Sequence, residues 1–361
     1  MCSSQCFCCR RGGCWSDSFR RIGRIMPDLS EQSRDRPPRH GLAKAVEATG
    51  IAAHKTAHLS PAFYRGGFWR LGLLAARICP PRVLKTMARL GAGIYLQCRQ
   101  GRAEVMVENF LPVFDGARSP AAKAARAAHR NFAAKLIDLW RVENGGNVTS
   151  WLTNDSELEI IHSARRRGRG ALFITLHLGN WEHGGLLLKQ LRIPLTILSL
   201  AEPDDRLTEL RNAARARYGV DTLIIGEDDF AFVEVIKRLQ AGADLALSLD
   251  RPPEGGSTVP VRFFGQPFNA SPAAAELARA SGCALIGVTI VRRPEGFAVK
   301  VLPEFAYDRR SLGNREMRTE LTQQILRAFE PEIRNNIEQW YQFTPIWPKE
   351  AKSIAADMSP L

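Results

Sequence analysis

Long apolar runs are missing from this chain of 361 residues. None approaches the roughly 20 residues that a membrane-spanning helix needs. The first 25 residues also lack the clean apolar core of a secretory signal. Neither a spanning helix nor a signal peptide is therefore predicted, and no internal repeat is visible.

A recurring cysteine pattern is missing as well. Five cysteines crowd the first fourteen residues, but no Cys-x-x-Cys pair recurs at zinc-site spacing and no histidine pair accompanies the cluster. We therefore expect no metal site, and nothing in the sequence requires a cofactor.

Acidic residues are too few to balance the basic ones, and the formal net charge is +13. Such a charge suggests a polyanionic partner: nucleic acid, an anionic membrane surface or an acidic carrier protein. No nucleic-acid recognition motif supports the first. The arginines at 165–169 suit an acidic carrier protein or anionic headgroups better. Residues 1–25 contribute +4, and one interpretation is that translation begins at Met26, which leaves +9.

The composition, 45% hydrophobic and 24% charged, is that of a globular protein. Residues 1–58 are rich in Arg, Ser, Pro and Cys with weak periodicity, and we predict them to be disordered. One domain is expected over 59–348, helical over 59–150 and α/β over 151–348, followed by a tail at 349–361.

Two helices in the first part of this domain combine apolar residues with arginines. They are expected at Phe63–Ile78 and Val83–Gln97, separated by Pro80-Pro81. Apolar residues beside arginines on short helices are typical of segments that lie on a membrane. The alternative is that both helices pack on the core with their arginines in solvent.

From residue 171 onward, predicted strands and helices alternate. This pattern indicates an α/β fold with a mixed, mainly parallel sheet covered by helices on both faces. Strands are expected at 171–176, 194–200, 221–225, 244–249, 259–264, 284–291 and 297–302, the last two antiparallel. Helices are expected at 181–191, 205–218, 228–240, 271–281 and 314–329. An earlier helix is expected to begin at Ser119-Pro120, with serine as its cap and proline at its first position.

The stretch 171–185 joins a buried strand to a polar cluster. His177 would stand at the carboxyl end of the strand, where ligands bind in open α/β sheets. Gly179 and Asn180 would turn the chain, and Glu182 would open a helix. Across this turn Glu182 could hold one imidazole nitrogen of His177 while the other faces a substrate, as general-base catalysis requires. The alternative is a structural histidine.

A second strand, 244–249, ends at Asp250 and Arg251. Because the carboxyl ends of parallel strands meet at one edge, this pair should lie at the same edge as His177. The alternative is a solvated ion pair in a connecting loop.

These blocks resemble the bacterial lipid A biosynthesis acyltransferases, within the wider lysophospholipid acyltransferase group. The resemblance covers roughly residues 65–347. It rests on four stretches: Thr175-Leu-His-Leu-Gly-Asn-Trp-Glu182, Asp250-Arg251 followed by Val261-Arg-Phe-Phe-Gly265, Glu108-Asn-Phe-Leu-Pro-Val-Phe114, and Ile337-Glu-Gln-Trp-Tyr341. Their order and spacing are more specific than any one of them.

The resemblance implies transfer of a fatty acyl group from acyl carrier protein or coenzyme A to a hydroxyl of a lipid acceptor. It implies a peripheral or interfacial place at the cytoplasmic face of the bacterial inner membrane. His177 would be the general base supported by Glu182, and Gly179 and Asn180 would offer backbone amides to the oxyanion.

The family also carries a basic residue in the helix after the second strand. Arg211, Arg215 and Arg217 are the choices here, and Arg215 is the nearest match for binding a phosphate on a substrate. Asp250 and Arg251 are further substrate-binding candidates.

The acceptor stays open. A lipid A precursor is the first expectation, but an Asp-Arg pair is closer to relatives that acylate phosphatidylinositol mannosides. An aminolipid or lysophospholipid acceptor, or an idle membrane-binding member of the fold, are the remaining alternatives.

Overall fold

The computed structural model describes residues 65–146, 150–200, 202, 204–225, 231–253 and 257–348. All of them fall within one contact unit, Ala43–Leu361. The expected disorder of residues 1–58, the alternative start at Met26 and the tail at 349–361 lie outside the described residues. The single domain over 59–348 stays a prediction.

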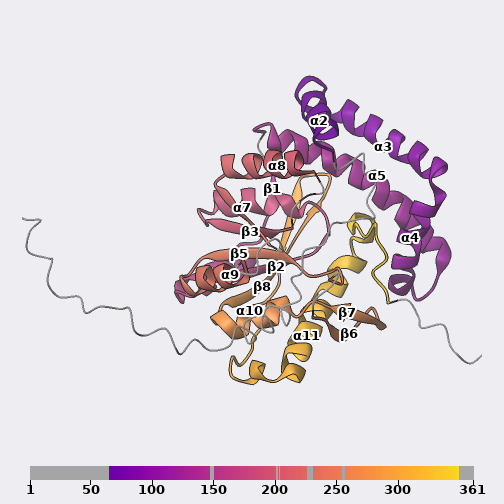
Figure 1. Cartoon of the computed structure of the whole chain (residues 1–361). Coiled ribbons are helices and arrows are strands. Elements are labelled where there is room, and N and C mark those ends of the chain that lie inside the picture. The colour runs from indigo at the N-terminus through magenta and orange to yellow at the C-terminus, as the bar shows by residue number, and fades with distance from the viewer. Residues whose placement is uncertain are drawn as a thin grey trace, which may run out of the picture. The chain divides into compact units, whose positions relative to one another are not determined.

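A seven-stranded sheet organises the described residues (Figure 1). Its order is β1-β9-β8-β2-β5-β3-β4, and every neighbouring pair is parallel except β8 with β9. The mixed, mainly parallel sheet predicted from the sequence is thus confirmed. The strands are β1 (Trp151–Leu152), β2 (Ala171–Thr175), β3 (Leu195–Ser199), β4 (Val220–Ile224), β5 (Asp244–Ser248), β8 (Ala284–Arg292) and β9 (Phe297–Val301).

Two strands were not expected. β1 has only two residues, too few for a recognisable alternation. β7 (Gln266–Ala270) pairs antiparallel with β6 (Val259–Phe263) in a separate two-stranded sheet. Pro267 lies within β7, and a proline makes a segment read as an edge strand or as no strand.

Helices cover both faces of the main sheet because β2 is apolar on both sides. Leu172 and Ile174 belong to a core with α9 (Ala231–Gln240), α10 (Ala273–Ser281) and α11 (Arg315–Arg334). Phe173 faces the opposite way, toward α6 (Asp155–Arg166) and α7 (Gly184–Gln190). A strand buried on both faces explains the continuous apolar run in the sequence.

The helices before the sheet form a layer of their own at the upper right of Figure 1. They are α2 (Gly66–Ile78), α3 (Pro81–Cys98), α4 (Gln100–Phe110) and α5 (Arg118–Glu143). Trp69 of α2 meets Trp140 of α5 edge to face, and both pack with Leu207 of α8 (Asp205–Arg217). None of the helices described here has the length and apolar character to cross a bilayer.

Two predicted helix boundaries were wrong. α5 begins at Arg118 with Ala117 as its N-cap, so Ser119 lies inside the first turn and does not cap it. α11 runs through Pro331 without a break, because Phe329 and Ile333 on either side are both buried in the core. Tertiary packing therefore outweighs the local signal of a proline.

Candidate active site

His177 stands just beyond β2, and its partner stands just beyond β5. The register of these parallel strands pairs Thr175 with Ser248, so His177 and Asp250 each follow by two residues and lie side by side. Nδ1 of His177 is 2.8 Å from Oδ1 of Asp250, and the backbone N–H of His177 donates to Oδ2 at 2.9 Å.

Asp250 is a completely buried carboxylate with a full set of donors. Besides His177, the indole Nε1–H of Trp340 donates to Oδ2 at 2.8 Å and Nε2–H of Gln342 donates at 2.6 Å. Burial alone would raise the pKa of Asp250, but the neighbouring His177 and Arg251 outweigh it and hold that pKa below its usual value. Asp250 is therefore ionised, and the proton of the His177–Asp250 bond resides on Nδ1.

The imidazole of His177 is neutral near pH 7. Burial lowers its pKa below the ordinary value of 6.5, and the charge of Arg251 lowers it further, against the opposing effect of Asp250. With Nδ1 protonated, Nε2 carries a lone pair that can accept a proton. This is the protonation state that a general base needs.

The prediction that Glu182 holds the imidazole was wrong. Trp181 and Glu182 lie in a 3₁₀ turn, Trp181–His183, that precedes α7. This turn directs Glu182 toward α5 and α8, where its carboxylate lies 2.7 Å from Nζ of Lys135 and 3.5 Å from Arg211. No hydrogen bond joins Glu182 to His177 among the described residues. The strand register instead places Asp250 next to Nδ1 of His177.

The two backbone amides expected to bind an oxyanion are also occupied. Gly179 N–H donates to the carbonyl of Gln339 at 2.8 Å, and Asn180 N–H donates to the carbonyl of Ile290 at 2.7 Å. A Cβ on Gly179, whose φ is 63°, would lie 2.1 Å from the Ile290 oxygen. The backbone amides of Gly179 and Asn180 thus bind the loop after His177 to β8 and to the C-terminal segment. The expected oxyanion role of these two amides was wrong.

A buried cluster of charges surrounds Glu182. Arg211 contacts Glu202, Glu182 and Glu143, the last two at 3.5 and 3.9 Å. Burial would raise the pKa of Glu182, but Lys135 and Arg211 outweigh it and lower that pKa. Glu182 is therefore ionised, and its charge ties the turn after His177 to α5 and α8.

The three arginines of α8 separate in the structure. Arg211 is the one that contacts Glu182. Arg215 lines a small cavity together with Glu182 and Arg211, and its guanidinium donates to the side chain of Asn212 at 3.3 Å. Burial and the charge of Arg211 lower the pKa of Arg215 to about 10. Arg217 donates to the backbone carbonyl of Glu143 instead.

The C-terminal segment closes the site. Tyr341 N–H donates to the carbonyl of His177 at 2.8 Å. Arg251 donates from Nε to Gln342 Oε1 at 3.1 Å and from Nη2 to the Tyr341 carbonyl at 3.0 Å. Asn109 binds the same segment, donating from Nδ2 to the carbonyls of Gln342 and Thr344 at 2.9 and 2.8 Å. The matched blocks around Asn109 and Tyr341 therefore meet at one place.

Several site residues could not be identified from the sequence. Trp340 lay in a block that was matched as a unit, and Gln342 lay directly after it. Lys135 stands in an alanine-rich helix with no motif around it. No group of three or more His, Cys, Asp or Glu within the described part of the chain is arranged to hold a metal ion.

Comparison with known proteins covers all of these blocks. The model of the bacterial lipid A biosynthesis acyltransferase family matches residues 54–349. Among curated proteins, the phosphatidylinositol mannoside acyltransferase of Mycolicibacterium smegmatis is 25% identical over 267 residues. That alignment covers 71% of this chain and 83% of the mycobacterial protein.

Proposed function

Because the chain belongs to the bacterial lipid A biosynthesis acyltransferase family, and is thus an acyltransferase of membrane lipids, we propose a specific reaction for it. A fatty acyl chain moves from an acyl carrier protein or coenzyme A thioester to a hydroxyl of a glycolipid, with His177 as the general base. The observation that carries this proposal is the 2.8 Å contact between Nδ1 of His177 and the buried carboxylate of Asp250.

The reaction follows from that protonation state. Nε2 of His177 takes the proton of the acceptor hydroxyl as its oxygen attacks the thioester carbonyl, and a C–O bond forms. The C–S bond then breaks, and the proton passes to the departing thiolate. Asp250 stabilises the imidazolium that exists between these steps. No acyl-enzyme is formed.

The oxyanion of the tetrahedral intermediate needs hydrogen-bond donors or a positive charge nearby. Since the amides of Gly179 and Asn180 are engaged elsewhere, we assign this role to Arg251. It directly follows Asp250, is held by the Tyr341 carbonyl and Gln342, and lowers the pKa of His177 by its charge. Arg215, in the charged cavity beside Glu182, is the proposed contact for a phosphate on the donor or acceptor.

A lipid A precursor is the first acceptor to test, and a phosphatidylinositol mannoside is the second. The second is favoured by the Asp250-Arg251 pair and by the activity named for the mycobacterial relative. Both acceptors combine sugar hydroxyls with phosphate, so the same base and arginines would serve either.

We further propose that α2 and α3 seat the enzyme on an anionic membrane surface, at the cytoplasmic face of the inner membrane. Most of the strongly exposed large apolar side chains in the described residues lie on these two helices: Leu71, Leu74, Ile78, Val83, Met87, Leu90 and Ile94. Their spacing places them in one stripe along each helix.

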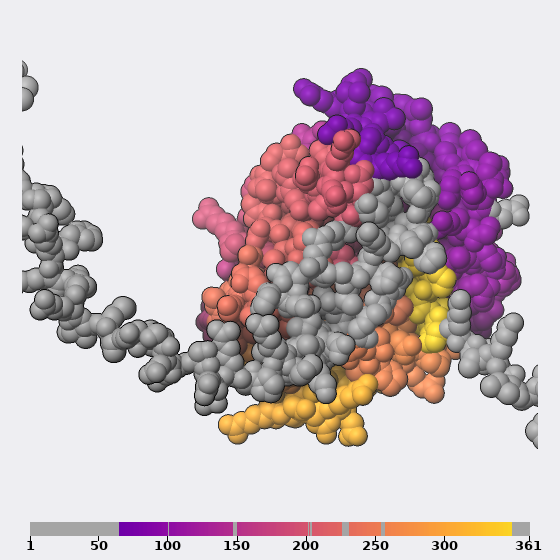
Figure 2. Space-filling model, in the orientation of Figure 1, coloured from indigo at the N-terminus to yellow at the C-terminus, as the bar shows by residue number. Residues whose placement is uncertain are grey.

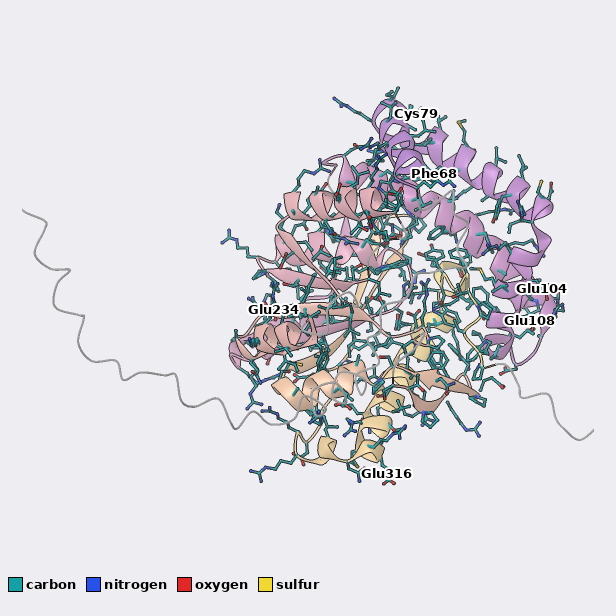
Figure 3. All side chains as sticks on the ribbon, in the orientation of Figure 1. Phe68, Cys79, Glu104, Glu108, Glu234 and Glu316 are labelled. Atoms are coloured by element: carbon teal, nitrogen blue, oxygen red, sulfur yellow. The ribbon has the colours of Figure 1, made fainter. Side chains whose placement is uncertain are left out.

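The charge of these two helices supports the same conclusion. Neither contains an acidic residue, while α2 and α3 carry two arginines each; the lysine of α3, Lys85, pairs instead with Asp138 of α5 at 2.5 Å. Figure 2 shows their surface, in indigo and purple, along the upper right of the molecule, and the nearest acids along the chain, Glu104 and Glu108, lie on α4 (Figure 3). Apolar and basic groups without acids fit an anionic lipid surface.

The deciding experiment pairs lipid analysis with enzymology. Mass spectrometry of lipids from a strain lacking the gene should reveal one acyl chain missing from one glycolipid. The purified enzyme should restore that chain from an acyl thioester, and His177→Ala should not. Restoration by His177→Ala at the wild-type rate would refute the assignment of the base.

A further inference from the structure

Lys135 is a buried cation in the middle of α5. Its side chain is only 3% exposed, and Nζ lies 2.9 and 2.7 Å from the two carboxylate oxygens of Glu182. Removing an ammonium group from water is costly, and such groups persist only where the surroundings compensate them. Glu182 already has Arg211 as a partner at 3.5 Å, so neutralising Glu182 does not by itself account for a buried lysine.

The second contact of Lys135 is the ring of Trp181. Nζ lies 3.2 Å from the centroid of that ring, well inside the roughly 6 Å within which a cation is attracted to an aromatic face. The same ring meets the imidazole of His177 at an angle of 68°, with centroids 5.1 Å apart. One ammonium group thus holds two successive residues of the turn after His177, and one of these packs on the imidazole.

From these contacts we infer that Lys135 is a positioning residue of the active site. It fixes the Trp181 ring against His177 and keeps Glu182 in place, so that Nε2 keeps its orientation toward the acceptor hydroxyl. The inference rests on the proposed function, because His177 must be the base. It also explains how Glu182 can matter to catalysis without touching His177.

The alternative is an ion pair that only stabilises the fold. A positioning role predicts a loss in kcat at unchanged KM and a dependence on the charge of residue 135. A structural role predicts a lower melting temperature with normal kinetics in the molecules that remain folded. Lys135→Met, which keeps the length of the side chain, separates the two. Lys123→Met on the exposed side of the same helix is the matched control.

The charge on Lys135 can also be removed by pH. Burial, together with the charges of Arg211 and Arg251, lowers its pKa to about 8 against the opposing effect of Glu182. The uncharged rings of Phe132 and Tyr341 complete its surroundings, with centroids 5.5 and 5.7 Å from Nζ. Above about pH 8 the ammonium loses its proton, and its attraction to Trp181 and Glu182 is lost.

The kinetic experiment compares Lys135→Met, Lys135→Arg and Lys123→Met with wild type, using an acyl thioester and the acceptor that the lipid analysis identifies. We expect kcat of Lys135→Met to fall at least tenfold with KM within twofold, and Lys123→Met to be normal. In wild type, kcat should fall above about pH 8, where Lys135 loses its proton. Lys135→Arg keeps a flat cation that can stack on Trp181, so it should recover part of kcat and should not show this fall. Wild-type kcat and pH profile in Lys135→Met would overturn the inference.

A second measurement does not depend on acyl transfer. Subtracting the fluorescence of Trp181→Phe from that of wild type isolates the emission of Trp181. This difference should titrate near pH 8 in wild type and not in the Lys135→Met background, and the absence of a titration in wild type would overturn the inference. If the fluorescence of Trp181 titrates near pH 8 in wild type but the wild-type protein transfers no acyl group, the proposed function is refuted and the role of Lys135 is not.

A variant with both charges removed covers the case in which Lys135→Met does not fold. Lys135→Met combined with Glu182→Gln leaves no unpaired buried carboxylate. It should show the same loss in kcat, and wild-type kcat in this double variant would equally overturn the role of Lys135.

Discussion

Replacing Asp250 by asparagine removes one charge from the site and keeps the shape of the side chain. The two carboxylate oxygens differ in what they accept. Among the described residues, Oδ1 accepts from Nδ1 of His177, whereas Oδ2 accepts from the His177 backbone, Trp340 and Gln342. The amide oxygen of the replacement should therefore take the Oδ2 position, which turns its NH₂ group toward Nδ1 of His177.

This arrangement reverses the tautomer of the histidine. An amide NH₂ can only donate, so Nδ1 must become the acceptor and Nε2 must carry the proton. Nε2 then has no lone pair for the acceptor hydroxyl. A positioned general base contributes roughly 10²–10⁴-fold to a rate, so kcat of Asp250→Asn should fall by that factor, equivalent to about 3–5 kcal/mol in the barrier.

Stability should change much less than activity. All four hydrogen bonds of the side chain can be kept after the tautomer switch, and only their charge assistance is lost, at about 1–3 kcal/mol in total. Asp244→Asn is the matched control. Asp244 is a buried acid at the other end of β5, where it accepts from Ala171 N–H at 3.1 Å and pairs with Arg165 at 2.8 Å.

Two measurements test the prediction together. Steady-state kcat is compared for wild type, Asp250→Asn and Asp244→Asn, and ¹⁵N NMR of the His177 imidazole reports which nitrogen carries the proton. We expect the proton on Nδ1 in wild type and in Asp244→Asn, and on Nε2 in Asp250→Asn. Wild-type kcat in Asp250→Asn, or an imidazole that keeps its proton on Nδ1 there, would refute the proposed role of the carboxylate.

Other predictions concern the loop, the membrane face and pH. Gly179→Ala should lower the free energy of unfolding by at least about 1–3 kcal/mol in chemical denaturation, because its φ of 63° and the 2.1 Å approach to Ile290 leave no room for a Cβ; an unchanged midpoint would contradict the tight packing of the loop. Met87→Ser with Leu90→Ser should weaken binding to anionic vesicles about thirty-fold, or roughly 2 kcal/mol, in a sedimentation assay. Binding as tight as that of wild type would remove these side chains from the interface. The pKa of His177 is held below its ordinary value of 6.5, so kcat/KM should fall to half of its plateau only below pH 6.5, where Nε2 is protonated; a half-maximal point above pH 6.5 would argue against His177 as the base.

The sheet and the place of the site could be predicted from the sequence because both depend on local patterns. The nearly continuous apolar run before His177 is typical of a strand buried on both faces or of a buried helix segment, and its short length favours the strand. The same argument brought Asp250 to the same edge. These inferences need no knowledge of which strands are neighbours.

The partner of His177 could not be predicted, because it depends on strand order. β5 comes three strands after β2 in the chain, yet it is the direct neighbour of β2, and only the register then places Asp250 at Nδ1. Glu182 was predicted as the partner of the imidazole because it lies only five residues after His177 in the sequence. The oxyanion prediction was wrong for a related reason: the carbonyls that accept from Gly179 and Asn180 come from residues 339 and 290, which lie far away in the sequence.

The dependence of Asp250 on Trp340 and Gln342 has a consequence for how the protein is made. Two donors to this buried charge lie 90 and 92 residues later in the chain than Asp250 itself. While the protein is being synthesised, the sheet can emerge from the ribosome before these donors exist. A buried carboxylate without its donors is strongly destabilised, so the pocket should become ordered only after residue 342 has docked. In a nascent chain, the His177–Asp250 pair should therefore become ordered only late in synthesis, when the C-terminal segment is available.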